Sequence, residues 1–167
     1  MSWKLESKTE YVPKYNNVKF NASILLLIGV FAASIRSAAT SFLPIADSVW
    51  IPVLGFVFLF DSIILIMWSQ WQFAKQFMRD GNRAAKHELV TSGIYKIVRH
   101  PRDLGFMILA LSCSLTCNSM IGILFTILFI ALTVIRIIDE DTFLKQEFGA
   151  EWITYSKSTP ALFPFIY

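Results

Sequence analysis

Long uncharged stretches dominate the pattern of hydrophobic and polar positions along the chain. One covers residues 20–35, and a second covers residues 48–74 with Asp61 as its only charged residue. A third runs without a charge from Leu104 to Ile135. A membrane-spanning helix needs about 20 mostly apolar residues, so each of the first two stretches predicts one span. The third stretch is too long for one span and about right for two short ones.

The third stretch holds one polar cluster, at residues 116–119, where Thr, Cys, Asn and Ser follow one another. Asn and Ser favour turns because their side chains hydrogen-bond nearby backbone groups, so we expect a turn there. The sequence therefore predicts an all-α fold, an integral membrane helical bundle forming a single domain over residues 1–167. Its transmembrane helices, about four in number, are expected at residues 20–40, 48–74, 101–117 and 119–138.

The basic residues predict which way these helices point. The first 19 residues carry four Lys, and segment 75–103 carries seven Lys and Arg. The connection at residues 37–48 and the turn near Asn118 carry none. Because cytoplasmic loops are enriched in Lys and Arg, we expect both termini and the segments 75–103 and 136–167 on the cytosolic side. A cleaved signal peptide is the alternative for the first span, but its long polar lead fits poorly.

The composition agrees with a membrane protein. Hydrophobic residues make up 55% and charged residues 16% of the chain, against roughly 45–50% and about 25% in soluble proteins. The net charge of +3 is small for a protein that binds nucleic acid, so no nucleic-acid partner is expected. Two Cys and two His make a poor metal site, and no metal is expected either.

The carboxy-terminal segment repeats apolar residues every three to four positions between residues 143 and 155. Such spacing among charges predicts an amphipathic helix on the cytosolic face of the membrane. Gly149 interrupts this pattern and is expected to divide the helix into two pieces.

Both histidines lie in the cytosolic segments. Thr91, Ser92 and Gly93 predict a turn, and His100 with Pro101 predicts the start of the third helix, because Pro fits the first helical position. The start of a helix offers free backbone N–H groups, which suit a carboxylate or phosphate. The alternative is a basic loop that faces anionic lipid.

Three charged residues in or beside the spans have more than one interpretation. Arg136 and Glu140 are four apart and share one helix face, either as part of a site or as a simple ion pair. Asp61 lies in mid-span, where an ionised carboxylate is costly. It is therefore protonated, partnered by a group such as Arg36, or part of a polar cavity.

Two motifs resemble one family. The run HELVTSGIYKIVRHP, residues 87–101, resembles the pattern of the isoprenylcysteine carboxyl methyltransferases and their bacterial and archaeal relatives. The second motif follows in the family's order: Arg136, Glu140, Phe148, Gly149, Tyr155, Leu162, Phe163 and Pro164. The resemblance covers residues 85–167. Two departures are Asp103, where the family usually has Tyr, and Asp141, where it usually has Glu.

The resemblance implies an integral membrane methyltransferase that binds S-adenosylmethionine in a cytosolic pocket closed by the carboxy-terminal segment. Arg136 would face the carboxylate of a prenylated or other lipophilic acceptor that arrives from the membrane lipid, and would be the catalytic residue. The residues that would bind the cofactor are His87, Glu88, Leu89, Val90, Gly93, Tyr95, His100, Pro101 and Glu140.

Other functions remain open on the sequence. A phospholipid or small-thiol methyltransferase would share the cofactor motifs and accept a different nucleophile. A sterol-type reductase would use NADPH, but residues 137–167 hold only two Lys against five acidic residues, a poor match to the 2′-phosphate. A non-enzymatic membrane protein is the third alternative. The sequence does not name the acceptor or the oligomeric state.

Overall fold

The computed structural model describes residues 17–40, 43–79 and 89–163, apart from the side chains of residues 17, 18, 20 and 76–79. All of its regular elements in these ranges are helical, which confirms the all-α prediction. They are α1 (Asn17–Thr40), α2 (Trp50–Arg79), the 3₁₀ helix η1 (Gly93–Lys96), α3 (Pro101–Thr116), α4 (Met120–Phe148) and α5 (Ala150–Ser158).

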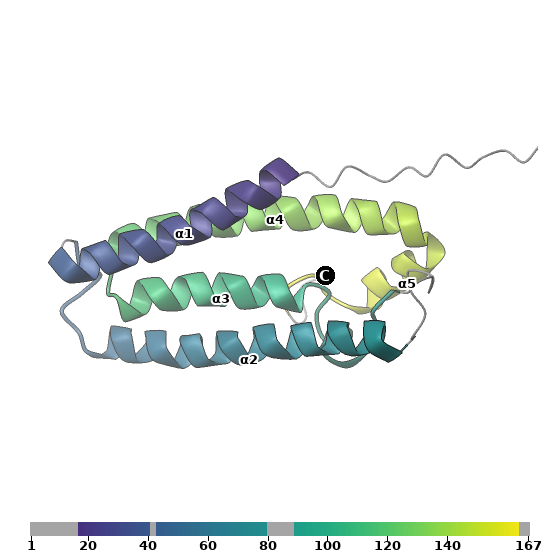
Figure 1. Ribbon diagram of the computed structural model, residues 1–167, viewed down its shortest axis with the longest axis horizontal. Helices are drawn as coiled ribbons and strands as arrows, with labels where there is room; N and C mark the ends of the chain where they lie inside the picture. The colour runs from purple at the N-terminus through teal and green to yellow at the C-terminus, as the bar shows by residue number, and fades with distance from the viewer. Residues whose placement is uncertain (1–16, 41–42, 80–88, 164–167) are drawn as a thin grey trace, which may run out of the picture.

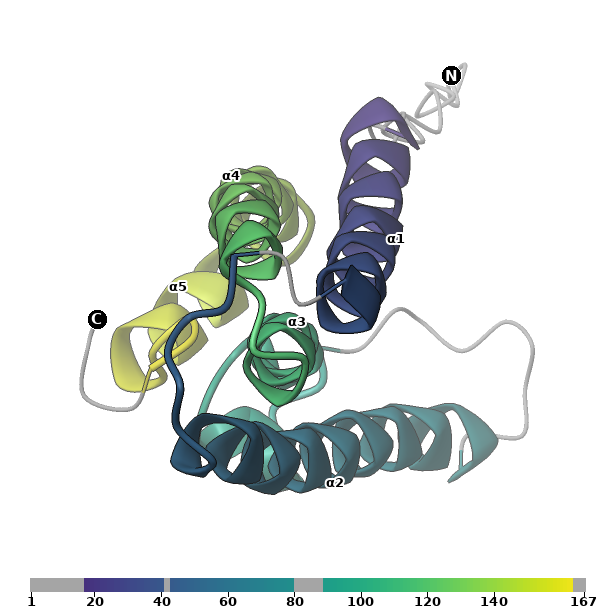
Figure 2. The ribbon, with the colours of Figure 1, turned by 90° about the vertical axis from the view of Figure 1, so that its left-hand side faces the viewer.

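The four long helices lie side by side, and α3 occupies the middle, in contact with α1, α2 and α4 (Figures 1 and 2). The α1–α2 connection and the α3–α4 turn meet at one end of the bundle. There, Pro44 forms an isolated bridge with Ser119, and the Asn118 side chain accepts a hydrogen bond from the Ile45 N–H at 3.0 Å. The opposite end carries η1, α5 and the start of α3. We call it the site end.

The helix boundaries follow the signals in the sequence, except that α2 continues to Arg79, past the predicted residue 74, and α4 continues past residue 138. The predicted turn is confirmed, because Asn118 has a positive φ of 48° and the Ser119 side chain caps α4. Gly149, at φ 54°, separates α4 from α5 as expected. The prediction that the fourth helix ends near residue 138 is wrong, since α4 continues to Phe148. Residues 139–148 contain no Gly or Pro, so nothing in the backbone stops the helix before Gly149.

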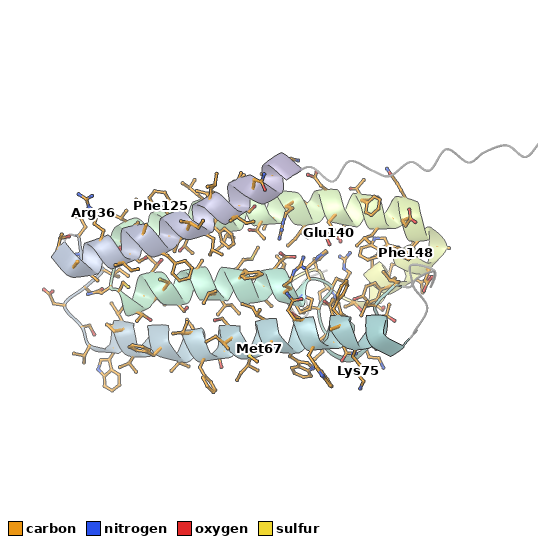
Figure 3. All side chains as sticks on the ribbon, in the orientation of Figure 1. Arg36, Met67, Lys75, Phe125, Glu140 and Phe148 are labelled. Atoms are coloured by element: carbon orange, nitrogen blue, oxygen red, sulfur yellow. The ribbon has the colours of Figure 1, made fainter. Side chains whose placement is uncertain are left out.

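Three of the described helices are long and apolar enough to cross a membrane, over the segments Asn21–Thr40, Trp50–Lys75 and Met120–Phe148. The 16 residues of α3 extend about 24 Å at 1.5 Å per residue, less than a hydrocarbon core of about 30 Å. Large apolar side chains such as Phe60 and Met67 are exposed on α2, as expected for a surface that faces lipid; Met67 is labelled in Figure 3.

Small residues bring the helices close together. A Cβ added to Gly55 on α2 would lie 2.4 Å from the Thr116 backbone N, and one added to Gly122 would lie 2.4 Å from Ser34 Oγ. Between α3 and α4, the hydroxyls of Ser114 and Thr126 are 2.9 Å apart. Helices in lipid associate through such close contacts and interhelical hydrogen bonds, so these residues hold α3 in the centre of the bundle.

Asp61 lies on an exposed face of α2. Within the described residues, Asp61 forms no ion pair with Arg36. Arg36 itself lies at the end of the bundle opposite to Glu140 (Figure 3). The suggested pairing of Asp61 with Arg36 is therefore wrong for this structure.

Candidate active site

The start of α3 forms the centre of the site end. His100 is the N-cap of α3 and Pro101 is its first residue, as the sequence predicts. Both are buried. This position places His100 beside α4, where its side chain contacts Asp141.

The carboxy-terminal segment runs back beside this helix start (Figure 1). The backbone N–H of Arg99 donates to the carbonyl of Pro160 at 2.9 Å, and that of His100 donates to the carbonyl of Ala161 at 3.0 Å. Thr159 and Pro160 are buried. The chain after α5 therefore covers the residues that lead into α3.

Asp141, on α4, holds the His100 imidazole. His100 is 5% exposed, and its Nε2 lies 2.7 Å from Asp141 Oδ1. The other Asp141 oxygen accepts a hydrogen bond from Arg99 Nη1 at 2.8 Å. Because an ionised carboxylate only accepts hydrogen bonds, the proton of this contact is on Nε2. His100 Nδ1 then faces Asp103 Oδ2, at 3.8 Å.

A second ion pair lies deeper in the bundle, between Asp103 on α3 and Arg136 on α4. Asp103 is 2% and Arg136 is 9% exposed, so both charges are buried. Taking two charges out of water is expensive, and such a pair is tolerated because each ion compensates the other. Arg136, the predicted acceptor residue, therefore has a carboxylate of this same chain against it.

Glu140 is one turn further along α4 and faces α3 (Figure 3). Its Oε2 atom is buried and accepts no hydrogen bond from the described residues. A buried carboxylate oxygen without a donor is unfavourable, and its position suits a ligand that brings a cationic donor. Glu140, His100 and Asp103 present oxygen or nitrogen atoms within 4.8 Å of one another, close enough to hold a metal ion.

We call Arg99, His100, Asp103, Arg136, Glu140 and Asp141 the polar cluster. It contains three carboxylates and two guanidinium groups, so it carries one net negative charge when His100 is neutral. A single positive charge on a ligand would balance it.

Two tyrosines connect η1 to α5. The Tyr155 hydroxyl donates to the backbone carbonyl of Tyr95 at 2.6 Å. Burial raises the pKa of Tyr155, so its hydroxyl remains a donor at neutral pH. Burial also raises the pKa of Tyr95, with the nearby Asp103 and Glu140 charges adding to the increase and Arg102 opposing it. The Tyr95 ring therefore lies near charged groups of the polar cluster.

Gly93 begins η1 at a positive φ of 62°. A Cβ there would lie 2.7 Å from Cδ of Gln72 on α2, so both the backbone and the packing favour Gly. The Gln72 amide also donates to Ser92 Oγ at 2.9 Å. These contacts fix the loop before α3 against the end of α2.

The structure brings together four of the predicted site residues, His100, Pro101, Arg136 and Glu140. Tyr95 lies near two of the charged residues, Asp103 and Glu140. Leu89 and Val90 are half-buried in the segment before η1. Gly93 provides the positive φ with which η1 begins. His87 and Glu88 lie outside the described residues.

The sequence reasoning did not foresee what Asp103 and Asp141 do. Asp103 follows His100 by three residues and so shares its helix face, which is the one sequence signal that places it near the site. Asp141 lies 41 residues from the histidine that it binds. No spacing in the sequence signals that contact.

Comparison with known proteins places this geometry in a family. The sequence profile described as phospholipid methyltransferase matches residues 50–151, which include the whole polar cluster. The chain belongs to the phospholipid methyltransferase family. The match, together with the relatives described next, confirms the resemblance expected from the two motifs.

Individual relatives match about half of the chain. Protein-S-isoprenylcysteine O-methyltransferase B of Arabidopsis thaliana is 35% identical over 85 residues, covering 50% of this chain and 43% of that protein. The protein-S-isoprenylcysteine O-methyltransferase of Schizosaccharomyces pombe is 35% identical over 85 residues, covering 50% and 36%. A Delta(14)-sterol reductase of Mus musculus is 33% identical over 87 residues, covering 50% and 21%. The matched segment spans less than half of the length of each of these relatives.

Proposed function

We propose that this protein is an S-adenosylmethionine-dependent methyltransferase that acts on a lipophilic acceptor at the membrane surface. The observation that carries the proposal is the buried Oε2 of Glu140, which accepts no hydrogen bond from the described residues, inside a polar cluster of three carboxylates and two guanidinium groups. Membership in a methyltransferase family supports it.

The charged and hydrogen-bonding groups at the start of α3 and on α4 fit this cofactor. S-adenosylmethionine has an ammonium, a sulfonium and a carboxylate, and its two cationic groups suit a cluster that contains three carboxylates. Glu140 would accept hydrogen bonds from the ammonium. The free N–H groups in the first turn of α3, after His100 and Pro101, would favour the carboxylate. The remaining predicted contacts are His87, Glu88, Leu89, Val90, Gly93 and Tyr95.

When bound, S-adenosylmethionine supplies an electrophilic methyl group. The chain's own residues position the reactants and limit their contact with water, which are the main contributions that such a transfer needs. Asp141 fixes the His100 ring, and the segment after α5 covers the helix start. No metal is proposed at His100, Asp103 and Glu140, because Arg136 already compensates Asp103.

The first candidate acceptor is the carboxylate of an isoprenylcysteine-like molecule, because relatives carry this substrate in their names. A carboxylate is ionised at neutral pH and needs no general base. Arg136 would receive it. The second candidate is a phospholipid amine, and the Asp103–Arg136 ion pair is the observation that favours it.

The proposed arrangement in the membrane has four spans, with α3 as a short third span and both termini in the cytosol. The site end would then lie at the cytosolic surface. A lipid-tailed acceptor could reach it sideways from the bilayer, while the water-soluble cofactor arrives from the cytosol.

Calorimetric titration of the purified chain in neutral detergent with S-adenosylhomocysteine, the demethylated cofactor, tests the proposal. We expect saturable binding with one ligand per chain. A folded protein that binds NADPH and not S-adenosylhomocysteine would favour the sterol-type reductase. A folded protein that binds neither would favour a non-enzymatic role. Incubation with methyl-labelled donor and a lipid extract then identifies the product.

A further inference from the structure

We infer that a second binding site lies at the end of the bundle opposite to the site end, and that it holds the phosphate of a membrane phospholipid on the guanidinium of Arg36. The proposed methyl transfer does not involve this end of the molecule, so the inference goes beyond it. Arg36 lies at the end of the bundle opposite to Glu140 (Figure 3).

A cavity of about 460 Å³ lies between α1 and the start of α4. Its lining consists of Ile121 on α4 and of four residues on α1, namely Ala33, Arg36, Ser37 and Thr40. The α1 residues follow helical spacing and so share one face of the helix. The volume is within the range of about 300–1,000 Å³ that is usual for small-molecule sites. The cavity thus combines one cationic group with two hydroxyl groups and apolar walls.

The charge of Arg36 has no internal counter-ion in the described part of the chain. None of the ion pairs found there includes Arg36. Asp47, the one carboxylate among the described residues of the α1–α2 connection, is exposed and forms no ion pair either. The Thr40 hydroxyl donates to the Arg36 backbone carbonyl at 2.9 Å, so the guanidinium is the main donor that faces a ligand. An anion would complete this cavity.

The depth of Arg36 in the membrane indicates a lipid phosphate. The apolar segment of α1 runs from Asn21 to Thr40, and Arg36 is four residues, about 6 Å, before its end. Basic side chains so close to the end of a span extend to the head-group region, where the phosphodiesters of phospholipids lie. The planar guanidinium can donate two parallel hydrogen bonds to a phosphate. The lipid phosphate is therefore complementary to Arg36 in both charge and depth.

The walls of the cavity fit the lipid as well as its phosphate. Ala33 and Ile121 are apolar and half-buried, which suits the glycerol backbone and not a hydrated inorganic ion. One turn further into the membrane, α1 and α4 are in direct contact, because a Cβ added to Gly29 would lie 3.3 Å from the Phe125 ring. This contact confines the cavity to the end of the bundle.

The start of α4 adds a weaker attraction for an anion. Ile121 belongs to the first turn of this helix, where the helix dipole is positive. The neighbouring N–H groups are already bound: that of Met120 donates to the Leu43 carbonyl at 3.1 Å, and that of Gly122 donates to Ser119 Oγ at 2.9 Å. The helix therefore contributes its field, and Arg36 contributes the specific contact.

A lipid bound at this place is not the methyl acceptor. Ile121 lines the cavity and Glu140 belongs to the polar cluster, and both lie on α4. They are 19 residues apart, which corresponds to about 29 Å at 1.5 Å per residue. The phosphate site therefore faces the leaflet opposite to the site end.

Calorimetric titration of the full chain in neutral detergent compares three probes. Dihexanoylphosphatidylglycerol carries the phosphodiester, dihexanoylglycerol lacks it, and inorganic phosphate lacks the lipid part. We expect the wild type to bind the phospholipid about tenfold more tightly than dihexanoylglycerol, a difference typical of one charged contact. Arg36→Gln should raise the Kd of the phospholipid about tenfold and leave that of dihexanoylglycerol unchanged. Inorganic phosphate should not displace the phospholipid.

Two variants control the comparison. Lys75→Gln removes a basic residue at the site end, where Lys75 lies over the Trp71 ring, and it should leave both Kd values unchanged. Ala33→Leu fills part of the cavity without changing its charge, and it should weaken the binding of both lipids.

An unchanged Kd of the phospholipid in folded Arg36→Gln would overturn the inference. If Arg36→Gln does not fold, Ala33→Leu decides, and unchanged binding of both lipids in that variant overturns the inference. Displacement of the phospholipid by inorganic phosphate would indicate a general anion site and overturn the assignment to a lipid. These titrations need no S-adenosylhomocysteine, so their outcome is independent of the proposed function.

Discussion

Replacing Glu140 by Gln should change cofactor affinity and protein stability in opposite directions. In the unliganded protein, Glu140 Oε2 is buried without a donor among the described residues. Neutralising this carboxylate removes a buried charge, so the free energy of unfolding should stay the same or rise. In the complex, the same change removes a charge-assisted hydrogen bond to the ammonium. That contact contributes about 1.5–3 kcal/mol, which corresponds to a loss of affinity of roughly tenfold to a hundredfold.

Two measurements on the same preparation check this expectation: calorimetric titration with S-adenosylhomocysteine, and thermal unfolding without ligand. Glu147→Gln is the matched control, because Glu147 lies on the same helix and is exposed. It should change neither quantity. Unchanged affinity in folded Glu140→Gln would refute the reasoning, and parallel losses of affinity and stability would indicate a structural role for Glu140.

Three further predictions concern stability and topology. Arg136→Met leaves the buried carboxylate of Asp103 without this counter-ion and should lower the free energy of unfolding, measured with denaturant, by about 3–5 kcal/mol. Adding Asp103→Asn should recover part of this loss; if the effects of the two substitutions simply add, the two residues are not coupled. Tyr155→Phe should cost about 1 kcal/mol through the lost hydrogen bond to Tyr95. Because burial raises the pKa of Tyr155 above its usual value of about 10, this residue makes wild-type stability fall above that pH, and thermal unfolding should show a smaller alkaline loss in Tyr155→Phe. In a background without native cysteines, an impermeant reagent should label Ala46→Cys from outside and Ser92→Cys only after permeabilisation; the reverse pattern would contradict the proposed orientation.

Most of the fold could be predicted because its signals are local. An uncharged stretch of about 20 mostly apolar residues predicts a membrane-spanning helix. Asn118 and Gly149 end helices because both adopt a positive φ. The end of the fourth helix was misjudged for the same reason. The hydropathy pattern changes near residue 138, yet a change in polarity does not end a helix when no residue interrupts its hydrogen bonds.

The site was less predictable, because its geometry depends on contacts between distant segments. The motif HELVTSGIYKIVRHP identified His100, and the second motif identified Glu140. The contact of His100 with Asp141 depends on how α3 lies against α4, and that arrangement depends on small residues such as Gly122 and Ser114. Helical spacing shows which residues share a face of one helix, but not which face of a neighbouring helix they meet.

The function of Arg136 shows why a motif does not fix an acceptor. A guanidinium at this position attracts a carboxylate, and the sequence offered two sources for it: the substrate, or Glu140 one turn away. The structure supplies a third, Asp103, from a different helix. What a buried charged residue can bind depends on the charges that already surround it, and not only on its own sign. In this structure Arg136 is one half of a buried ion pair with Asp103, so its position in the motif does not by itself predict that it binds an acceptor carboxylate.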